Sequence, residues 1–125
     1  MTTSLPVRVL LVAAGGAVGT AARLGVGMIV PDSPGIPWSI LVVNLLGAFL
    51  IGVLAARLPS SSDRRLFLAT GVLGGFTTYS AFAVGTVELW SQAPLLATLY
   101  AFGSLILGVV VAVAGMRVGR RRADG

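Results

Sequence analysis

The feature that most constrains this chain is the length of its apolar runs. Four stretches of about 20 or more residues contain almost no charge, and short segments rich in proline, serine and arginine separate them. A helix needs roughly 20 residues to cross the ~30 Å hydrocarbon core of a bilayer. Only 10% of the residues are charged, whereas a soluble domain carries about 25%. The chain is therefore predicted to be an all-α integral membrane protein.

The runs predict one membrane domain with four spanning helices. We expect these helices at about residues 7–30, 38–57, 65–90 and 94–116, followed by a basic tail at 117–125. The segment from Pro31 to Gly35 contains the helix breakers that end the first run. That run is longer than the apolar core of a signal peptide and three further spans follow, so we expect it to remain as a helix.

The arginines predict how the chain crosses the membrane. Four spans place both termini and the loop between the second and third spans on one side, and that side collects eight of the nine arginines. The positive-inside rule then predicts cytoplasmic termini in a cell inner or plasma membrane. Trp38 and Trp90 lie at the opposite ends of their spans, where an aromatic belt is expected. Arginines that flank spans do not favour a nucleic-acid partner.

The chain lacks most side chains on which enzymes depend. It has no cysteine and no histidine, and its only acidic residues are Asp32, Asp63, Glu88 and Asp124. Thiol chemistry and histidine-based or carboxylate-cluster metal chemistry are therefore excluded. We expect a protein that is not an enzyme.

The third span contains an unusual segment at mid-membrane depth, Gly74-Gly75-Phe76-Thr77-Thr78-Tyr79-Ser80. Each glycine weakens a helix by about 1 kcal/mol relative to alanine, so this segment predicts a helix break. A break at this depth is tolerated where it is buried in protein or lines a wet cavity, and it can present carbonyls to a cation or amides to an anion. A kinked helix that serves packing alone is the other interpretation.

Two further polar residues lie inside predicted spans, and each has two interpretations. Arg23 can extend toward the membrane surface, or it can place a fixed positive charge in a vestibule that attracts anions. Asn44 can hydrogen-bond to a neighbouring helix, or its amide can replace water around an anion in a pore.

Three motifs occur in order along the chain. They are Gly15-Gly16-x-x-Gly19-x-x-x-Arg23, then Asn44-x-x-Gly47-x-Phe49-x-x-Gly52, then Gly71-x-x-Gly74-Gly75-Phe76-Thr77-Thr78-Tyr79-Ser80-x-Phe82. Together they resemble the Fluc (CrcB) fluoride channel family. The glycine patterns alone are weak, but the third motif combined with the other two is highly specific. The resemblance covers essentially the whole chain.

The resemblance implies a fluoride-selective channel for passive fluoride efflux, built as an antiparallel dimer of four-helix subunits in membrane lipid. A broken third helix is implied, with a structural Na⁺ at the dimer centre held by the backbone carbonyls of Gly74 and Thr77. Asn44 corresponds to the family's pore asparagine, and Arg23 corresponds to its vestibule arginine.

The remaining fluoride-pathway candidates are aromatic and hydroxyl residues. By resemblance, Tyr79 and Phe82 stand where the family has two pathway-lining phenylalanines. The hydroxyl candidates are Thr78, Ser80, Tyr100 and Ser104. The chain departs from the family pattern at several positions: Tyr79 replaces phenylalanine, Ile40 stands where threonine is expected, and Gly108 and Ala112 interrupt the polar track of the fourth helix.

The arginine bias also bears on the partner. A chain that inserts in both orientations should have nearly balanced loop charges, and this chain does not. We therefore expect an oppositely oriented related subunit as partner, with self-pairing after insertion both ways as the alternative.

Two other functions fit a four-helix chain of this size. A small multidrug-resistance-type exporter relies on an acidic residue in its first helix, which residues 9–30 do not contain. A non-transporting membrane assembly subunit would use the glycine-rich packing faces but gives no role to the polar break.

Overall fold

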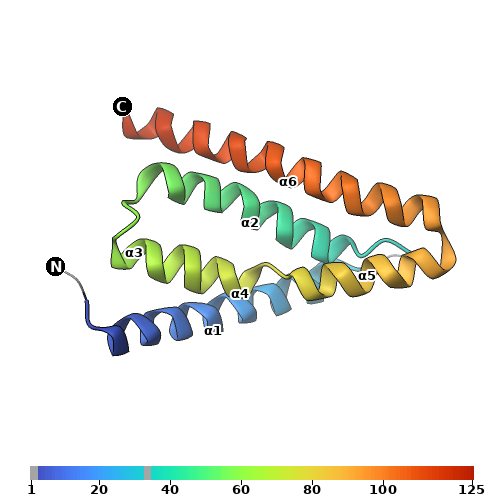
Figure 1. Cartoon of the computed structure of the whole chain (residues 1–125), viewed down its shortest axis with the longest axis horizontal. Helices are drawn as coiled ribbons and strands as arrows, with labels where there is room; N and C mark the ends of the chain where they lie inside the picture. Colours follow the sequence, from blue (N-terminus) through green and yellow to red (C-terminus); the bar gives the residue numbers. More distant parts are fainter. Residues whose placement is uncertain (1–2, 33–34) are drawn as a thin grey trace.

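Helices that are long and apolar enough to cross a membrane dominate the fold. The computed structural model describes residues 3–32 and 35–125, so the expected breakers Ser33 and Pro34 lie outside the described residues. Within these ranges, four such helical stretches are found, at Leu5–Ile29, Trp38–Arg57, Asp63–Gln92 and Pro94–Ala123. Both ends of the chain lie at the same end of the bundle (Figure 1). The prediction of an all-α fold with four spans is confirmed.

The helices associate as pairs. α1 (Leu5–Ile29) packs along the first half of the third span, and α2 (Trp38–Arg57) packs along α6 (Pro94–Ala123). The second half of the third span turns to α6 instead, as Figure 1 shows. The third span therefore changes partners along its length, and it does so at the predicted break.

The third span consists of four helical segments. These are α3 (Asp63–Arg65), the π-helical segment η1 (Leu66–Leu73), α4 (Gly74–Phe76) and α5 (Tyr79–Gln92). Thr77 and Thr78 between α4 and α5 are extended, with ψ angles of 155° and 117°. The break predicted from the Gly74–Ser80 segment is thus confirmed, and it is confined to two residues.

Glycines allow α1 to approach the third span closely. A Cβ atom at Gly19 would overlap the carbonyl oxygen of Val72, and one at Gly75 would overlap the carbonyl oxygen of Gly16. Gly15 and Gly71 face each other in the same contact, where a Cβ on either would lie 2.9 Å from the other's Cα. This is the small-residue packing that membrane helices use where lipid provides no hydrophobic drive for their association.

α6 is longer than expected. It continues to Ala123, whereas the sequence predicted a helix end at residue 116 and a separate tail. Arginine favours helix and no proline intervenes, and Gly119 packs against Ala56 and Val53 of α2. A helix of 30 residues is about 45 Å long, so its basic end extends beyond a ~30 Å hydrocarbon core.

Close glycine packing predicts a sharp difference between two alanine substitutions. Gly19→Ala should destabilise the folded chain by about 1–3 kcal/mol or more, because its Cβ has no room beside the Val72 carbonyl. Gly25→Ala in the same helix is the control, since no described atom outside its own helix backbone and chain neighbours lies within 4 Å of its Cβ position. Thermal unfolding in detergent measures both. An equal loss of stability in the two variants would show that the close approach does not matter.

Candidate functional site

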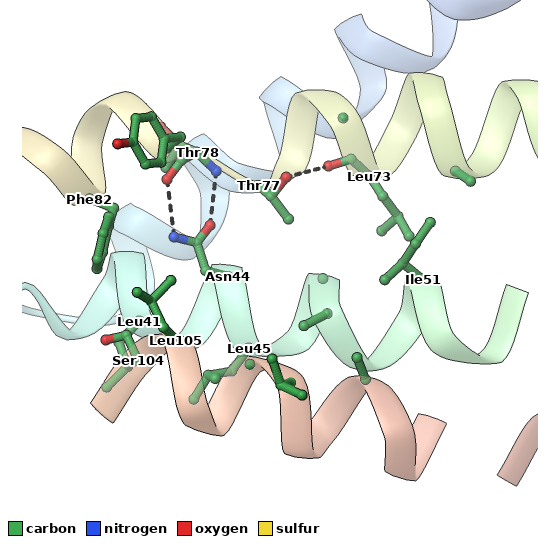
Figure 2. A pocket seen from close by; sticks show the side chains of 18 of the residues that line it. Leu41, Asn44, Leu45, Ile51, Leu73, Thr77, Thr78, Phe82, Ser104 and Leu105 are labelled. Atoms are coloured by element: carbon green, nitrogen blue, oxygen red, sulfur yellow. Dashed lines mark hydrogen bonds between the residues drawn. The ribbon is translucent and has the colours of Figure 1, made fainter. Parts of the chain in front are cut away.

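A cavity of about 550 Å³ lies beside the break, between α2, the third span and α6. Most of the residues expected on a fluoride pathway line it, as Figure 2 shows in part. They are Asn44, Thr78, Tyr79, Phe82, Tyr100 and Ser104. Gly74 and Thr77, the expected cation ligands, line the same cavity. The cavity wall is otherwise largely aliphatic, so these polar groups are set in an apolar surround.

Asn44 forms a pair of hydrogen bonds with the break. The backbone amide of Thr78 donates to Oδ1 of Asn44 at 2.9 Å, and Nδ2 of Asn44 donates to the Thr78 carbonyl at 3.0 Å. Figure 2 shows the two bonds side by side. One side-chain amide thus satisfies both backbone polar groups of an extended residue. The second N–H of Nδ2 is not used in this pair, and Asn44 lines the cavity.

The Thr78 side chain begins α5. Its hydroxyl oxygen accepts a hydrogen bond from the Ala81 amide at 3.2 Å, which is the geometry of a helix N-cap. The same hydroxyl lies 3.3 Å from the Ser80 hydroxyl. Ser80 therefore joins the polar group through Thr78, although it is exposed and does not line the cavity.

Three aromatic rings lie in series next to these polar groups. The centroids of Tyr79 and Phe82 are 6.2 Å apart, and those of Phe82 and Tyr100 are 5.6 Å apart, with both pairs tilted. Tyr100 is buried, with 7% of its surface exposed, and its hydroxyl has no hydrogen-bond partner within residues 3–32 and 35–125. Tyr79 is 81% exposed. The ring series therefore runs from the bundle interior to its open surface.

The two cavity-lining hydroxyls of α6, those of Ser104 and Tyr100, differ in whether their hydrogen is free to bind a ligand. Ser104 donates to the Tyr100 carbonyl within α6, so its hydrogen is used by its own helix. The buried Tyr100 hydroxyl keeps its hydrogen for a partner that the described chain does not supply. Gly108 and Ala112, which interrupt the polar track, also line the cavity.

Two of the carbonyls at the break have helical donors that bind other acceptors here. In a continuous helix, the Gly74 carbonyl would accept from the Thr78 amide, and the Thr77 carbonyl would accept from the Ala81 amide. Here the Thr78 amide donates to Asn44 and the Ala81 amide donates to the Thr78 hydroxyl. Gly74 is exposed, and apart from its chain neighbours and its own helix backbone no described atom lies within 4 Å of its Cβ position.

A second cavity of about 520 Å³ lies on the other side of the break and contains Arg23. Thr20, Ser39 and Ile40 also line it, and Thr78 lines both cavities. The break is thus the wall between the two cavities. Ile40, where the sequence departs from the family's threonine, contributes an apolar side chain here.

Two contacts could not be anticipated from the motifs. Oδ1 of Asp32 accepts hydrogen bonds from both the amide and the hydroxyl of Ser39, at 3.0 and 2.9 Å. It thereby provides an acceptor for a backbone amide at the start of α2, although it lies seven residues before Ser39 in the chain. The hydroxyl of Thr20 donates to the Gly75 carbonyl at 3.4 Å. The sequence signal for the Asp32–Ser39 contact is an acidic residue shortly before the start of a predicted helix.

Comparison with known proteins places these features in a family. A family model described as CrcB-like protein, Camphor Resistance (CrcB), matches residues 10–116. A fluoride-specific ion channel FluC of Thermus thermophilus is 50% identical over 118 residues, covering 90% of this chain and 94% of that protein. A protein with the same name from Agrobacterium fabrum is 43% identical over 121 residues, covering 91% and 97%. One from Paracoccus denitrificans is 45% identical over 115 residues, covering 89% and 93%.

Proposed function

The chain belongs to the CrcB family, and on that premise we propose that it is a fluoride-selective channel that gives passive fluoride efflux across a membrane. The observation that carries the proposal is the buried Tyr100 hydroxyl, which has no hydrogen-bond partner among the described residues, on a side chain that lines the cavity with its ring next to Phe82. A buried polar group without a partner is rare, and it usually indicates a ligand or an ordered water. An ion channel carries out no covalent chemistry, so no catalytic residue is assigned.

Fluoride is small and strongly hydrated, so a narrow pathway must replace its water with hydrogen-bond donors. The Tyr100 hydroxyl and the unused N–H of Asn44 are such donors on one cavity. The edge of an aromatic ring is the positive part of its quadrupole, so Phe82 and Tyr79 can face an anion edge-on. Arg23 in the second cavity provides a positive charge that attracts anions toward the pathway.

Among the rival functions, the exporter has the least support. A proton-coupled exporter needs an acidic residue within its first helix, and α1 spans Leu5–Ile29 without one. A structural assembly subunit has no use for a buried hydroxyl that finds no partner in the described part of the chain.

We further propose that a structural Na⁺ binds at the break. Hard cations prefer oxygen ligands, and broken membrane helices present carbonyls to Na⁺. Gly74 and Thr77 supply two carbonyls whose helical donors have been redirected, next to open space at Gly74. These residues fit the ion chemically. A bound Na⁺ supplies positive charge that eases the passage of an anion nearby.

A dimer would complete this site. Two carbonyls are too few ligands for a cation, and a second copy or a related subunit would bring two more. The open side of the cavity carries the exposed Tyr79 ring and Gly74. A tyrosine hydroxyl at mid-membrane depth is poorly suited to lipid, so this face is better covered by protein than by acyl chains. We propose that an antiparallel partner covers it.

The orientation proposal follows the arginines. The basic end of α6, the end of α2 and the start of α1 lie together in the fold (Figure 1). We propose that the protein lies in a cell inner or plasma membrane. The positive-inside rule then predicts that this end, with both termini, faces the cytoplasm. An antiparallel pair then requires a related subunit of opposite bias, with self-pairing as the alternative.

Reconstituted protein should pass fluoride and largely exclude chloride. Liposome efflux read with a fluoride electrode and a chloride electrode measures the selectivity. Tyr100→Phe should lower fluoride flux by about tenfold or more, because it removes a donor to a charged ion and keeps the ring. Ser104→Ala is the matched control, since the Ser104 hydroxyl donates to its own helix.

Asn44→Asp should also reduce fluoride flux strongly, because a carboxylate replaces a donor amide. Equal fluoride and chloride flux would contradict the proposed function. So would the absence of fluoride flux both from this chain alone and from this chain reconstituted with an oppositely oriented partner subunit.

The sodium proposal predicts that dimer stability depends on Na⁺. A ligand that binds only the folded dimer raises its stability by mass action. Replacing Na⁺ with a large organic cation at constant ionic strength should therefore lower the melting temperature in detergent. An unchanged melting temperature would contradict the proposed sodium site.

The orientation proposal predicts one-sided labelling. The chain has no cysteine, so Ser33→Cys, at a position outside the described residues, and Ala123→Cys can be tested singly. A membrane-impermeant maleimide added to intact cells should label only Ser33→Cys. Substantial labelling of both variants would show insertion in both orientations and favour self-pairing.

A further inference from the structure

We propose that Asn44 is a positioning residue that keeps the third helix broken and thereby frees the Gly74 carbonyl for a cation. This inference rests on the proposed sodium site. It assigns Asn44 a role beyond that of a donor on the fluoride pathway.

The first step is the competition for one amide hydrogen. The last helical bond of α4 joins the Thr77 amide to the Leu73 carbonyl at 2.9 Å. The next bond of a continuous helix would join the Thr78 amide to the Gly74 carbonyl. Oδ1 of Asn44 takes that amide at 2.9 Å instead. The helix therefore stops one hydrogen bond short of satisfying Gly74.

The second step is that Asn44 compensates the break completely at Thr78. Its Nδ2 donates to the Thr78 carbonyl at 3.0 Å, so neither backbone group of this buried residue is left without a partner. Unpaired backbone groups are strongly disfavoured in hydrocarbon. Without the Asn44 amide, the acceptor that a continuous helix would give the Thr78 amide is the Gly74 carbonyl, four residues earlier in the chain.

The third step concerns the register of α2 against the break. Gly47 lies three residues after Asn44, on the same face of α2. A Cβ at Gly47 would overlap the Thr77 methyl group, so the absence of a side chain there admits Thr77. Two positions of α2 therefore fit two consecutive residues of the break. The Thr77 methyl group packs against Gly47, and Asn44 forms hydrogen bonds with the backbone of Thr78.

The consequence is a link between two ion sites. The same side chain presents its spare N–H to the cavity and, through the Thr78 amide, controls whether the Gly74 carbonyl is available. Tyr100 has no such connection, because its hydroxyl has no hydrogen-bond partner in the described chain.

The test compares Asn44→Leu with Tyr100→Phe. Leucine is close in shape to asparagine but removes both hydrogen bonds, whereas Tyr100→Phe removes only a cavity donor. The measurement is the Na⁺ concentration that gives half of the thermal stabilisation of the dimer. Asn44→Leu should raise it by about tenfold or more, as expected when a buried hydrogen-bond partner is lost. Tyr100→Phe should leave it unchanged.

Several outcomes separate this inference from the proposals on which it rests. If the wild-type dimer responds to Na⁺ and Asn44→Leu responds at the same concentration, the positioning role is overturned while the sodium site stands. If the wild type does not respond to Na⁺ at all, the sodium proposal fails first. Fluoride efflux by the wild type, measured on the same preparation, tests the channel function independently of both.

A measurement on the wild-type protein covers the case in which Asn44→Leu does not fold. Amide hydrogen exchange at Thr78 is followed with Na⁺ and with a large organic cation in its place. If Asn44 holds the break, the Thr78 amide stays protected under both conditions and the ¹³Cα chemical shift of Thr78 stays that of an extended residue. Loss of protection, or a shift to the helical value, when Na⁺ is removed would show that the ion holds the break, and would overturn the inference.

Discussion

The structure depends on how the backbone polar groups at the break are satisfied. A membrane interior offers no water, so each amide and carbonyl released from a helix needs another partner. Asn44 supplies both partners of Thr78, and the Thr78 hydroxyl supplies one for Ala81. The Gly74 and Thr77 carbonyls are the groups whose usual donors are redirected. The proposed sodium site rests on this distribution of hydrogen bonds.

Close helix packing makes the break possible. Gly19, Gly75 and Gly47 let neighbouring backbone or side-chain atoms occupy the space of a Cβ, and these contacts lie on both sides of the broken segment. The third span can then leave α1 and turn to α6 at the break. The two cavities lie on either side of the break and share Thr78 as their common wall.

The sequence was sufficient for the spans and for the existence of the break, because both arise from local composition: run length, a glycine pair and adjacent hydroxyl residues. It could not reveal the Asn44–Thr78 pair. That contact joins two residues 34 positions apart in the chain, and it depends on how α2 is aligned against the third span. α6 extends beyond its predicted end because a run of arginines is compatible with a solvated tail and with a helix alike, and arginine favours helix. The unpartnered state of the Tyr100 hydroxyl depends on burial by Phe82 and its neighbours, which only the fold shows.

The third helix is broken at Thr77 and Thr78, and we propose that Asn44 keeps it broken. An experimental structure in lipid with Na⁺ present, at a resolution that defines backbone carbonyls, is the sharpest test. It should show the paired Asn44–Thr78 hydrogen bonds, with Gly74 and Thr77 carbonyls from two subunits converging on one ion. A helix that continues through residues 74–81, with the Thr78 amide bonded to the Gly74 carbonyl, would contradict it.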